Sequence, residues 1–239
     1  MKHDLASSGL PAKPPRPAAE IFGDRLPLAQ RYAEILADSG VSHGLIGPRE
    51  AARLWERHLI NCAIVESVLP HRTRLVDVGS GAGLPGLVLA IARPDIEVLL
   101  MEPMLRRTRW LDDTVADLGL GNVTVRRGRA QEFHGRLITP VVTARAVARL
   151  SELAAWCLPL LGPGGRLLAL KGRSAEQELA EDLPALRGLG VESAGVRVLG
   201  ESVVATPTRV IELTVAPASS GSAVPTTSPT VTMRDDGSR

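Results

Sequence analysis

Short apolar runs alternate with amphipathic stretches along the central part of the chain. In the runs nearly every residue is apolar, as in buried strands, whereas in the stretches apolar residues recur every three or four positions, as on one face of a helix. This alternation predicts a parallel sheet covered by helices on both faces. The last two runs follow each other without a helix and are expected to pair antiparallel. The seven predicted strands lie at residues 75–78, 96–101, 123–125, 141–144, 166–170, 191–199 and 209–215.

Helical patterns precede the predicted sheet, and both ends of the chain have the composition of tails. A first helix is expected after Asp24, its candidate cap, and a second from Pro48 to about Leu69. Ser151 is placed to cap a later helix. The two ends are rich in proline or in serine and threonine and hold few groups to bury. We therefore expect an unstructured tail, a helical extension, a sheet domain and a second tail, at residues 1–20, 21–72, 73–216 and 217–239.

Composition places the chain among globular proteins and excludes several kinds of site. The 28 basic and 26 acidic side chains nearly cancel, which argues against non-specific coating of nucleic acid. The two cysteines, Cys62 and Cys157, are too few for a disulfide scaffold and too far apart for a cysteine zinc site. The histidines have no metal-ligand spacing. No apolar run reaches the ~18 residues that span a bilayer. We expect a cytoplasmic protein with no metal and no membrane segment.

A glycine-rich loop between the first predicted strand and the next helix is the most informative segment; it reads DVGSGAGLPG from Asp77 to Gly86. Glycines let the backbone turn tightly and let a ligand approach it closely. Two ligands fit this pattern. Gly81-x-Gly83-x-x-Gly86 satisfies the dinucleotide fingerprint, in which a pyrophosphate lies at the helix N-terminus. Asp77-x-Gly79-x-Gly81-x-Gly83 is the pattern of S-adenosylmethionine (SAM) sites.

The charges near the loop distinguish between the two candidate ligands. Asp77 puts a negative charge beside the loop, which suits a sulfonium and an ammonium group and is unfavourable beside a pyrophosphate. Pro85 removes one N–H from the helix start, which weakens a phosphate cradle. Glu102, at the end of the second predicted strand, is placed to accept hydrogen bonds from both ribose hydroxyls, as either ligand requires. We therefore favour SAM over NAD.

These motifs resemble those of the RsmG (GidB) family, bacterial methyltransferases that modify N7 of a guanine in small-subunit ribosomal RNA. The resemblance runs from about residue 24 to 216. It implies a class I SAM-dependent methyltransferase fold, which is Rossmann-like α/β with a mostly parallel seven-stranded sheet, an antiparallel last hairpin and a helical N-terminal extension. The segments that carry the resemblance are Arg57–Asn61, Asp77–Gly86, Arg129–Phe133, Ala144–Ala146 and Ala169–Gly172.

The resemblance also implies roles for single residues. Gly79 and Leu84 would contact the cofactor from the loop, Ala130 and Gln131 would lie against its adenine, and Arg145 would project toward the site. Relatives often carry Glu where this chain has Gln131. A cofactor contact made by the backbone at this position would be kept in this chain, whereas one that needs a side-chain carboxylate would be lost. Together with the loop and strand-end residues, the predicted cofactor-binding set is Asp77, Gly79, Gly81, Gly83, Leu84, Glu102, Ala130, Gln131 and Arg145.

The implied reaction needs no general base, because guanine N7 carries a lone pair and no proton. The protein must instead supply proximity and in-line geometry. Arg145 and Lys171 are the candidates to act at the reacting groups, and His58 with Asn61 faces the site by resemblance, in a structural or a substrate role. Basic residues that follow the third and fifth strands are expected to contact RNA phosphates. The predicted RNA-binding set is Arg126, Arg127, Arg129, Lys171, Arg173 and His58.

The expected partner is 16S rRNA or the small ribosomal subunit, with the protein acting as a monomer and binding neither DNA nor membrane. Three alternatives remain open from the residues. They are a SAM-dependent methyltransferase acting on a small molecule, an NAD-linked oxidoreductase, and a non-catalytic RNA-binding protein that keeps the fold.

Overall fold

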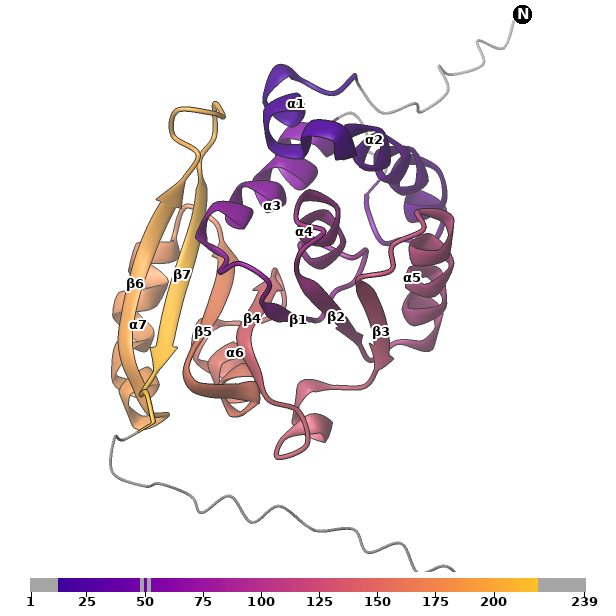
Figure 1. Ribbon diagram of the computed structural model, residues 1–239. Helices are drawn as coiled ribbons and strands as arrows, with labels where there is room; N and C mark the ends of the chain where they lie inside the picture. The colour runs from indigo at the N-terminus through magenta and orange to yellow at the C-terminus, as the bar shows by residue number, and fades with distance from the viewer. Residues whose placement is uncertain (1–12, 48–49, 51–52, 219–239) are drawn as a thin grey trace, which may run out of the picture.

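A seven-stranded sheet forms the centre of the protein (Figure 1). The computed structural model describes residues 13–47, 50 and 53–218. The strand order is β3-β2-β1-β4-β5-β7-β6, with β1 to β5 parallel and β7 antiparallel to both neighbours. This confirms the predicted sheet and its last hairpin. The strands are β1 (Arg74–Val78), β2 (Glu97–Glu102), β3 (Val123–Arg127), β4 (Thr139–Arg145), β5 (Leu161–Lys171), β6 (Val191–Leu199) and β7 (Thr208–Val215).

Successive strand residues feed two apolar cores, one on each face of the sheet. Leu75 of β1 belongs to the core that contains α4, α5 and the helical extension, whereas its neighbour Val76 belongs to the core that contains α6 and α7. Figure 1 shows these two groups of helices on opposite sides of the strands. The parallel strands are thus covered on both faces. The helices are α4 (Gly86–Ala92), α5 (Leu105–Asp117), α6 (Leu150–Cys157) and α7 (Ala175–Gly188).

The helical extension packs beside α4 and is built from short helices and turns. Its α-helices are α1 (Arg16–Phe22), α2 (Leu26–Ile35) and α3 (Asn61–Ala63). Tighter or wider helical turns join them. From Leu54 to Val68 the predicted second helix is helical but irregular, with a wider turn, α3 and a tighter turn in succession. The turns of the extension are η1 (Gly23–Arg25), η2 (Leu36–Gly40), η4 (Leu54–Ile60) and η5 (Ile64–Val68). Two further turns lie later in the chain, η6 (Ala130–Phe133) and η7 (Leu158–Leu160).

Three local predictions are wrong. Residues 16–20 lie in α1, where Ala18 is buried, so this part of the predicted first tail is folded. Asp24 lies in η1 and caps nothing, because α2 begins only at Leu26. Ser151 lies inside α6, which begins at Leu150. Pro48, most of the first predicted tail and nearly all of the second lie outside the described residues, and the division into domains stays a prediction.

Within the described part of the chain, no helix combines the length and the apolar character that crossing a membrane requires. The same residues contain no group of three or more His, Cys, Asp or Glu side chains arranged to hold a metal ion.

Candidate functional site

The glycine loop turns sharply where β1 ends. Gly79 has φ +70°, a conformation that side-chain-bearing residues avoid, and its N–H donates to the Met101 carbonyl of β2 at 2.8 Å. A Cβ on Gly79 would lie 2.9 Å from Val147 Cγ2. At the other end of the loop, a Cβ on Gly86 would lie 2.4 Å from Leu100 Cδ2 and 2.7 Å from Asp77 Oδ2. Both glycines are therefore required by close packing around the loop.

Asp77 is fully buried beneath the loop and holds it from within. Its Oδ2 accepts the Gly86 N–H at 3.1 Å, and its Oδ1 accepts the Thr143 hydroxyl of β4 at 3.2 Å. Burial raises the pKa of Asp77 to about 6, against the lowering effect of these hydrogen bonds and of the Arg145 charge. In these contacts the carboxyl orients the loop and the start of α4.

Glu102, at the end of β2, holds the same loop from outside. Its carboxylate accepts the Gly81 N–H at 3.0 Å and the Met104 N–H at 3.1 Å, and only 2% of the residue is exposed. Arg107 Nη1 lies 3.9 Å away. Each oxygen keeps a second lone pair, so a hydroxyl group could still be accepted there. The predicted ribose contact of Glu102 stays a prediction.

A cavity of about 380 Å³ opens beside the loop, between the ends of β1 and β2 and the turn η6. Its walls are mostly apolar, which suits the face of a purine. Three residues of the predicted cofactor-binding set, Gly79, Ala130 and Gln131, meet in it. Because glycine at position 79 leaves the cavity wall without a side chain, the residues present fit an adenosine-bearing cofactor. The other lining residues are Val78, Met101, Pro103, Gly128, Arg129, Val147 and Trp156.

The rest of the predicted cofactor-binding set does not line this cavity. Gly83 and Leu84 form the inner turn of the loop, where both N–H groups donate to the Ser80 carbonyl. Gly81 is tied to Glu102 as described above. Asp77 and Arg145 lie beneath the loop and at the end of β4. Their direct contact with a cofactor stays a prediction.

Arg145, at the end of β4, binds the helical extension. Its Nη2 lies 2.7 Å from His58 Nδ1 and 3.2 Å from the Arg57 carbonyl, and its Nη1 lies 3.0 Å from Cys62 Sγ. Because a guanidinium only donates, His58 Nδ1 accepts; the proton of the neutral ring is therefore on Nε2, 2.9 Å from Glu50 Oε2. Burial, and next the Arg145 charge, lower the pKa of His58 and favour this neutral ring.

Lys171, the second catalytic candidate, is engaged by the protein itself. Its Nζ donates to the Ala148 carbonyl at 2.8 Å and to Glu178 Oε1 of α7 at 2.7 Å, and only 12% of the side chain is exposed. These bonds hold the segment after β4. In that segment Ala146 has φ +54°, which costs a non-glycine residue roughly 1–2 kcal/mol. Lys171 therefore stabilises the turn that places Val147 against Gly79.

The predicted RNA-binding residues separate into two places. Arg126, Arg127 and Arg129 are exposed at and just after the end of β3, and Arg129 lines the cavity beside the loop. Arg173 is exposed after β5 and lines a different cavity. Lys171 and His58 are bound to protein groups instead. RNA binding by any of these residues stays a prediction.

Sequence reasoning missed several residues of the site. Val147 and Trp156 line the cavity, and the Tyr32 hydroxyl donates to the Ala82 carbonyl of the loop. Periodicity marks Tyr32 and Trp156 only as helical core positions, and Val147 belongs to no predicted element. Their contacts join segments far apart in the chain, so spacing alone carries no signal for them.

The sheet order, with a glycine loop after β1 and an acidic residue at the end of β2, defines a class I SAM-dependent methyltransferase. The profile of the rRNA small subunit methyltransferase G family, GidB, matches residues 25–203. The chain belongs to this family. The predicted family, fold class, methyltransferase activity and SAM cofactor are thus confirmed.

Relatives of the chain carry the same family name. It is 54% identical over 200 residues to ribosomal RNA small subunit methyltransferase G of Pseudarthrobacter chlorophenolicus, covering 84% of this chain and 93% of that protein. It is 56% identical over 198 residues to the Thermobifida fusca protein of the same name, covering 83% of this chain and 84% of that protein. A SAM-dependent methyltransferase from Aquifex aeolicus has a TM-score of 0.52 at 15% identity, covering 74% of this chain and 98% of that one. This last likeness shows the fold alone.

Proposed function

We propose that the protein transfers the methyl group of SAM to N7 of a specific guanine in 16S rRNA of the small ribosomal subunit. The observation that carries the proposal is the cavity beside Gly79, where three predicted cofactor residues meet, in a chain more than 50% identical to proteins named small subunit rRNA methyltransferases. Exposed arginines at the same end of the sheet provide positive charge for an RNA strand.

The protein's part in this reaction is to hold two reactants in line. When bound, SAM supplies a methyl group on a sulfonium. Ala130 and Gln131 would hold its adenine, Glu102 its ribose, and the backbone at Gly79 the part nearest the loop. Because guanine N7 has no proton to lose, no side chain needs to act as a base. Arg145 and Lys171 then act as positioning residues, Arg145 for the helical extension and Lys171 for the segment that carries Val147.

The partner in this proposal is 16S rRNA or the assembled small subunit, met in the cytoplasm by a monomer, with no DNA or membrane involved. The proposal is tested with small subunits and purified 16S rRNA from cells that lack this methyltransferase. We expect methyl label from SAM to enter RNA, and borohydride and aniline to cleave the labelled strand at one guanine, since N7 methylation makes that nucleotide labile. DNA of the same sequence should stay unlabelled. Label that enters only small molecules would favour the alternative, a small-molecule methyltransferase, and would overturn the proposal.

A further inference from the structure

A second cavity, of about 510 Å³, lies between the helical extension and the loop that joins β6 to β7. Its floor is apolar, with Ile60 on one side and Val203 and Val204 on the other. Its rim is basic: Arg53 and Arg57 of the helical extension and Arg173 after β5 line it. We refer to it as the arginine groove. An apolar floor between guanidinium groups is chemically suited to a nucleotide, whose base is planar and whose phosphate is anionic.

The two walls of the arginine groove are fixed to each other. Asn61 Nδ2 donates to Thr208 Oγ1 at 2.8 Å, and that hydroxyl donates back to the Asn61 carbonyl at 2.9 Å. A Cβ on Gly200 would lie 2.5 Å from Ile64 Cδ1, so the β6–β7 loop packs directly on η5. Figure 1 shows this loop rising beside α1 and α3. The groove is therefore preformed, which lowers the entropy that binding would cost.

Positive charge outweighs negative charge among the described residues that line the groove. Arg53 and Arg173 are exposed and have no ion pair among the residues that the structure describes. Arg57 Nε lies 3.3 Å from Glu50 Oε2, so the positive charge of Arg57 is partly offset by this carboxylate. Glu56 is the only carboxylate among the described lining residues. Arg53 and Arg173 thus both line the groove without a described ion pair, and guanidinium groups of this kind bind phosphate well.

The arginine groove adjoins the end of β4. The Arg57 carbonyl, on the helix turn that forms one wall, accepts Arg145 Nη2 at 3.2 Å. Arg173, on the other side, follows β5, whose Leu170 pairs with Arg145 in the sheet. A strand of RNA lying in the groove would therefore pass the carboxyl ends of β4 and β5, next to the glycine loop.

We propose that the arginine groove binds single-stranded RNA beside the target guanine, with phosphates on Arg53 and Arg173 and a base or sugar on the apolar floor. This inference rests on the proposed function, because it assumes an RNA substrate. It assigns RNA contact to Arg53, which sequence analysis did not single out, and it separates Arg173 from Arg126 and Arg127. An anion as small as free phosphate would not need the apolar floor.

The test compares two double variants of the full chain with equal loss of charge. Arg53→Gln with Arg173→Gln neutralises the groove. Arg109→Gln with Arg187→Gln is the control, since both residues are exposed on α5 and α7 without a described ion pair. Binding of a single-stranded RNA oligonucleotide is measured at several salt concentrations, with SAM binding by calorimetry and methylation of small subunits. We expect the groove variant to bind RNA at least tenfold more weakly, with the salt slope reduced by about 1.4 for two lost phosphate contacts.

The control variant should bind RNA within about threefold of the wild type, and SAM affinity should stay unchanged in both variants. Wild-type RNA binding and methylation in the groove variant would overturn the inference and leave the proposed function standing. An equal loss in the control would also overturn it, by showing a bulk-charge effect. A wild-type protein that neither binds RNA nor methylates it would instead overturn the proposed function.

Discussion

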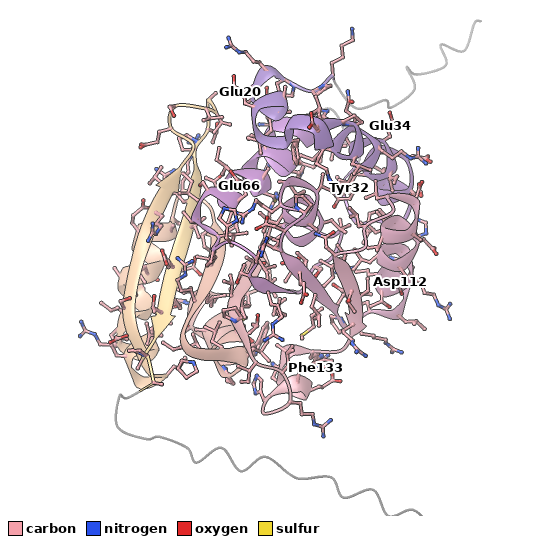
Figure 2. The ribbon with its side chains drawn as sticks, viewed as in Figure 1. Glu20, Tyr32, Glu34, Glu66, Asp112 and Phe133 are labelled. Atoms are coloured by element: carbon pink, nitrogen blue, oxygen red, sulfur yellow. The ribbon has the colours of Figure 1, made fainter. Side chains whose placement is uncertain are left out.

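The hydroxyl of Tyr32 in α2 donates a hydrogen bond to the backbone carbonyl of Ala82 in the glycine loop. Tyr32 is fully buried and lies beneath α2 in Figure 2. Burial raises its pKa well above the usual range, so the phenol keeps its proton and remains a donor. A helix of the extension thus fixes the glycine loop through a contact between residues 50 positions apart in the sequence. The helical extension therefore helps to hold the loop beside the candidate cofactor cavity.

Replacing Tyr32 by Phe tests this relationship. The change removes only the hydroxyl and leaves the Ala82 carbonyl without its partner, so we expect a loss of about 1–2 kcal/mol in stability. Because the lost bond restrains the loop, SAM affinity should fall about three- to tenfold. Thermal unfolding and calorimetric titration with SAM measure the two effects. Ser39→Ala is the matched control: it removes the bond from Trp110 Nε1 at 2.9 Å, away from the loop. Equal SAM affinity in Y32F and S39A would contradict the role given to Tyr32.

Gly79 allows a comparison between two glycines in the same backbone conformation. Gly79 has φ +70° and Gly119 has φ +62°, but a Cβ on Gly119 would meet nothing within 4 Å. Each Ala substitution should therefore lose about 1 kcal/mol of stability from backbone strain. Only Gly79→Ala also pushes on Val147 in the wall of the cavity. We expect SAM affinity to fall more than tenfold in G79A and to be unchanged in G119A, measured by calorimetry; Gly79→Val should abolish binding.

Sequence patterns predict the sheet well because they reflect local physics. Apolar runs bounded by turns give all seven strands, and the missing helix before the last strand gives the antiparallel pair. The glycine loop can also be predicted, because tight turns and close approach to the backbone require glycine, and the glycines are visible in the sequence. Gly79, Ala130 and Gln131, expected from a motif and a resemblance, do meet in one cavity.

Contacts between residues far apart in the chain could not be predicted from the sequence pattern. The first N–H groups of α6 are satisfied by Glu178 Oε1 and Asp182 Oδ2 of α7, each at 2.8 Å, so the expected serine cap at Ser151 is unnecessary. Lys171 directly follows the predicted fifth strand, so the pattern predicts that it faces a substrate; in the structure it ends β5 and its ammonium donates to Ala148 and Glu178. Such partners come from elements that the chain pattern does not place relative to each other.

Asp77 should make stability depend on pH in a specific direction. Its pKa is raised from 3.8 to about 6 by burial. Because the folded value is the higher one, this carboxyl contributes stability that is fully present below about pH 4 and lost as pH rises through 6. A difference of about two units between the folded and unfolded pKa of Asp77 corresponds to about 3 kcal/mol in the free energy of unfolding. We expect Asp77→Asn, whose amide can accept from Gly86 and donate to Thr143, to lack this dependence, as denaturant unfolding of both proteins from pH 4 to 7.5 would measure.

The same variant separates the geometry of Asp77 from its charge. If the carboxyl acts by holding Gly86 and Thr143, Asp77→Asn should bind SAM within about threefold of the wild type at pH 7.5. Asp77→Ala, which loses both hydrogen bonds, should bind more than tenfold more weakly and unfold more easily. Should D77N lose SAM as completely as D77A, the negative charge itself would be what the cofactor requires.

The contact between His58 and Arg145 predicts a second pH dependence, in the rate of methyl transfer. Neutral His58 accepts from Arg145 and donates to Glu50; its pKa lies below the usual 6.5 because of burial and the Arg145 charge. Protonation would set two cations against each other, with Arg57 nearby, while Glu50 offsets part of the charge. The contact is therefore intact above pH 6.5 and is lost as pH falls through the lowered pKa of His58. Below that pKa we expect the rate to fall about tenfold per pH unit.

His58→Asn isolates this effect from the titration of Asp77, which occurs in a similar range. An Asn oxygen can accept from Arg145 in place of Nδ1 but does not titrate. The variant should therefore keep near wild-type activity at pH 7.5 and lose less activity at pH 5.5, with SAM affinity followed at each pH to exclude a loss of cofactor. His58→Leu, which offers no acceptor, should be impaired at every pH. An acid limb that is the same in the wild type and in H58N would assign the loss to Asp77 or to the RNA, and would leave His58 with a purely structural role.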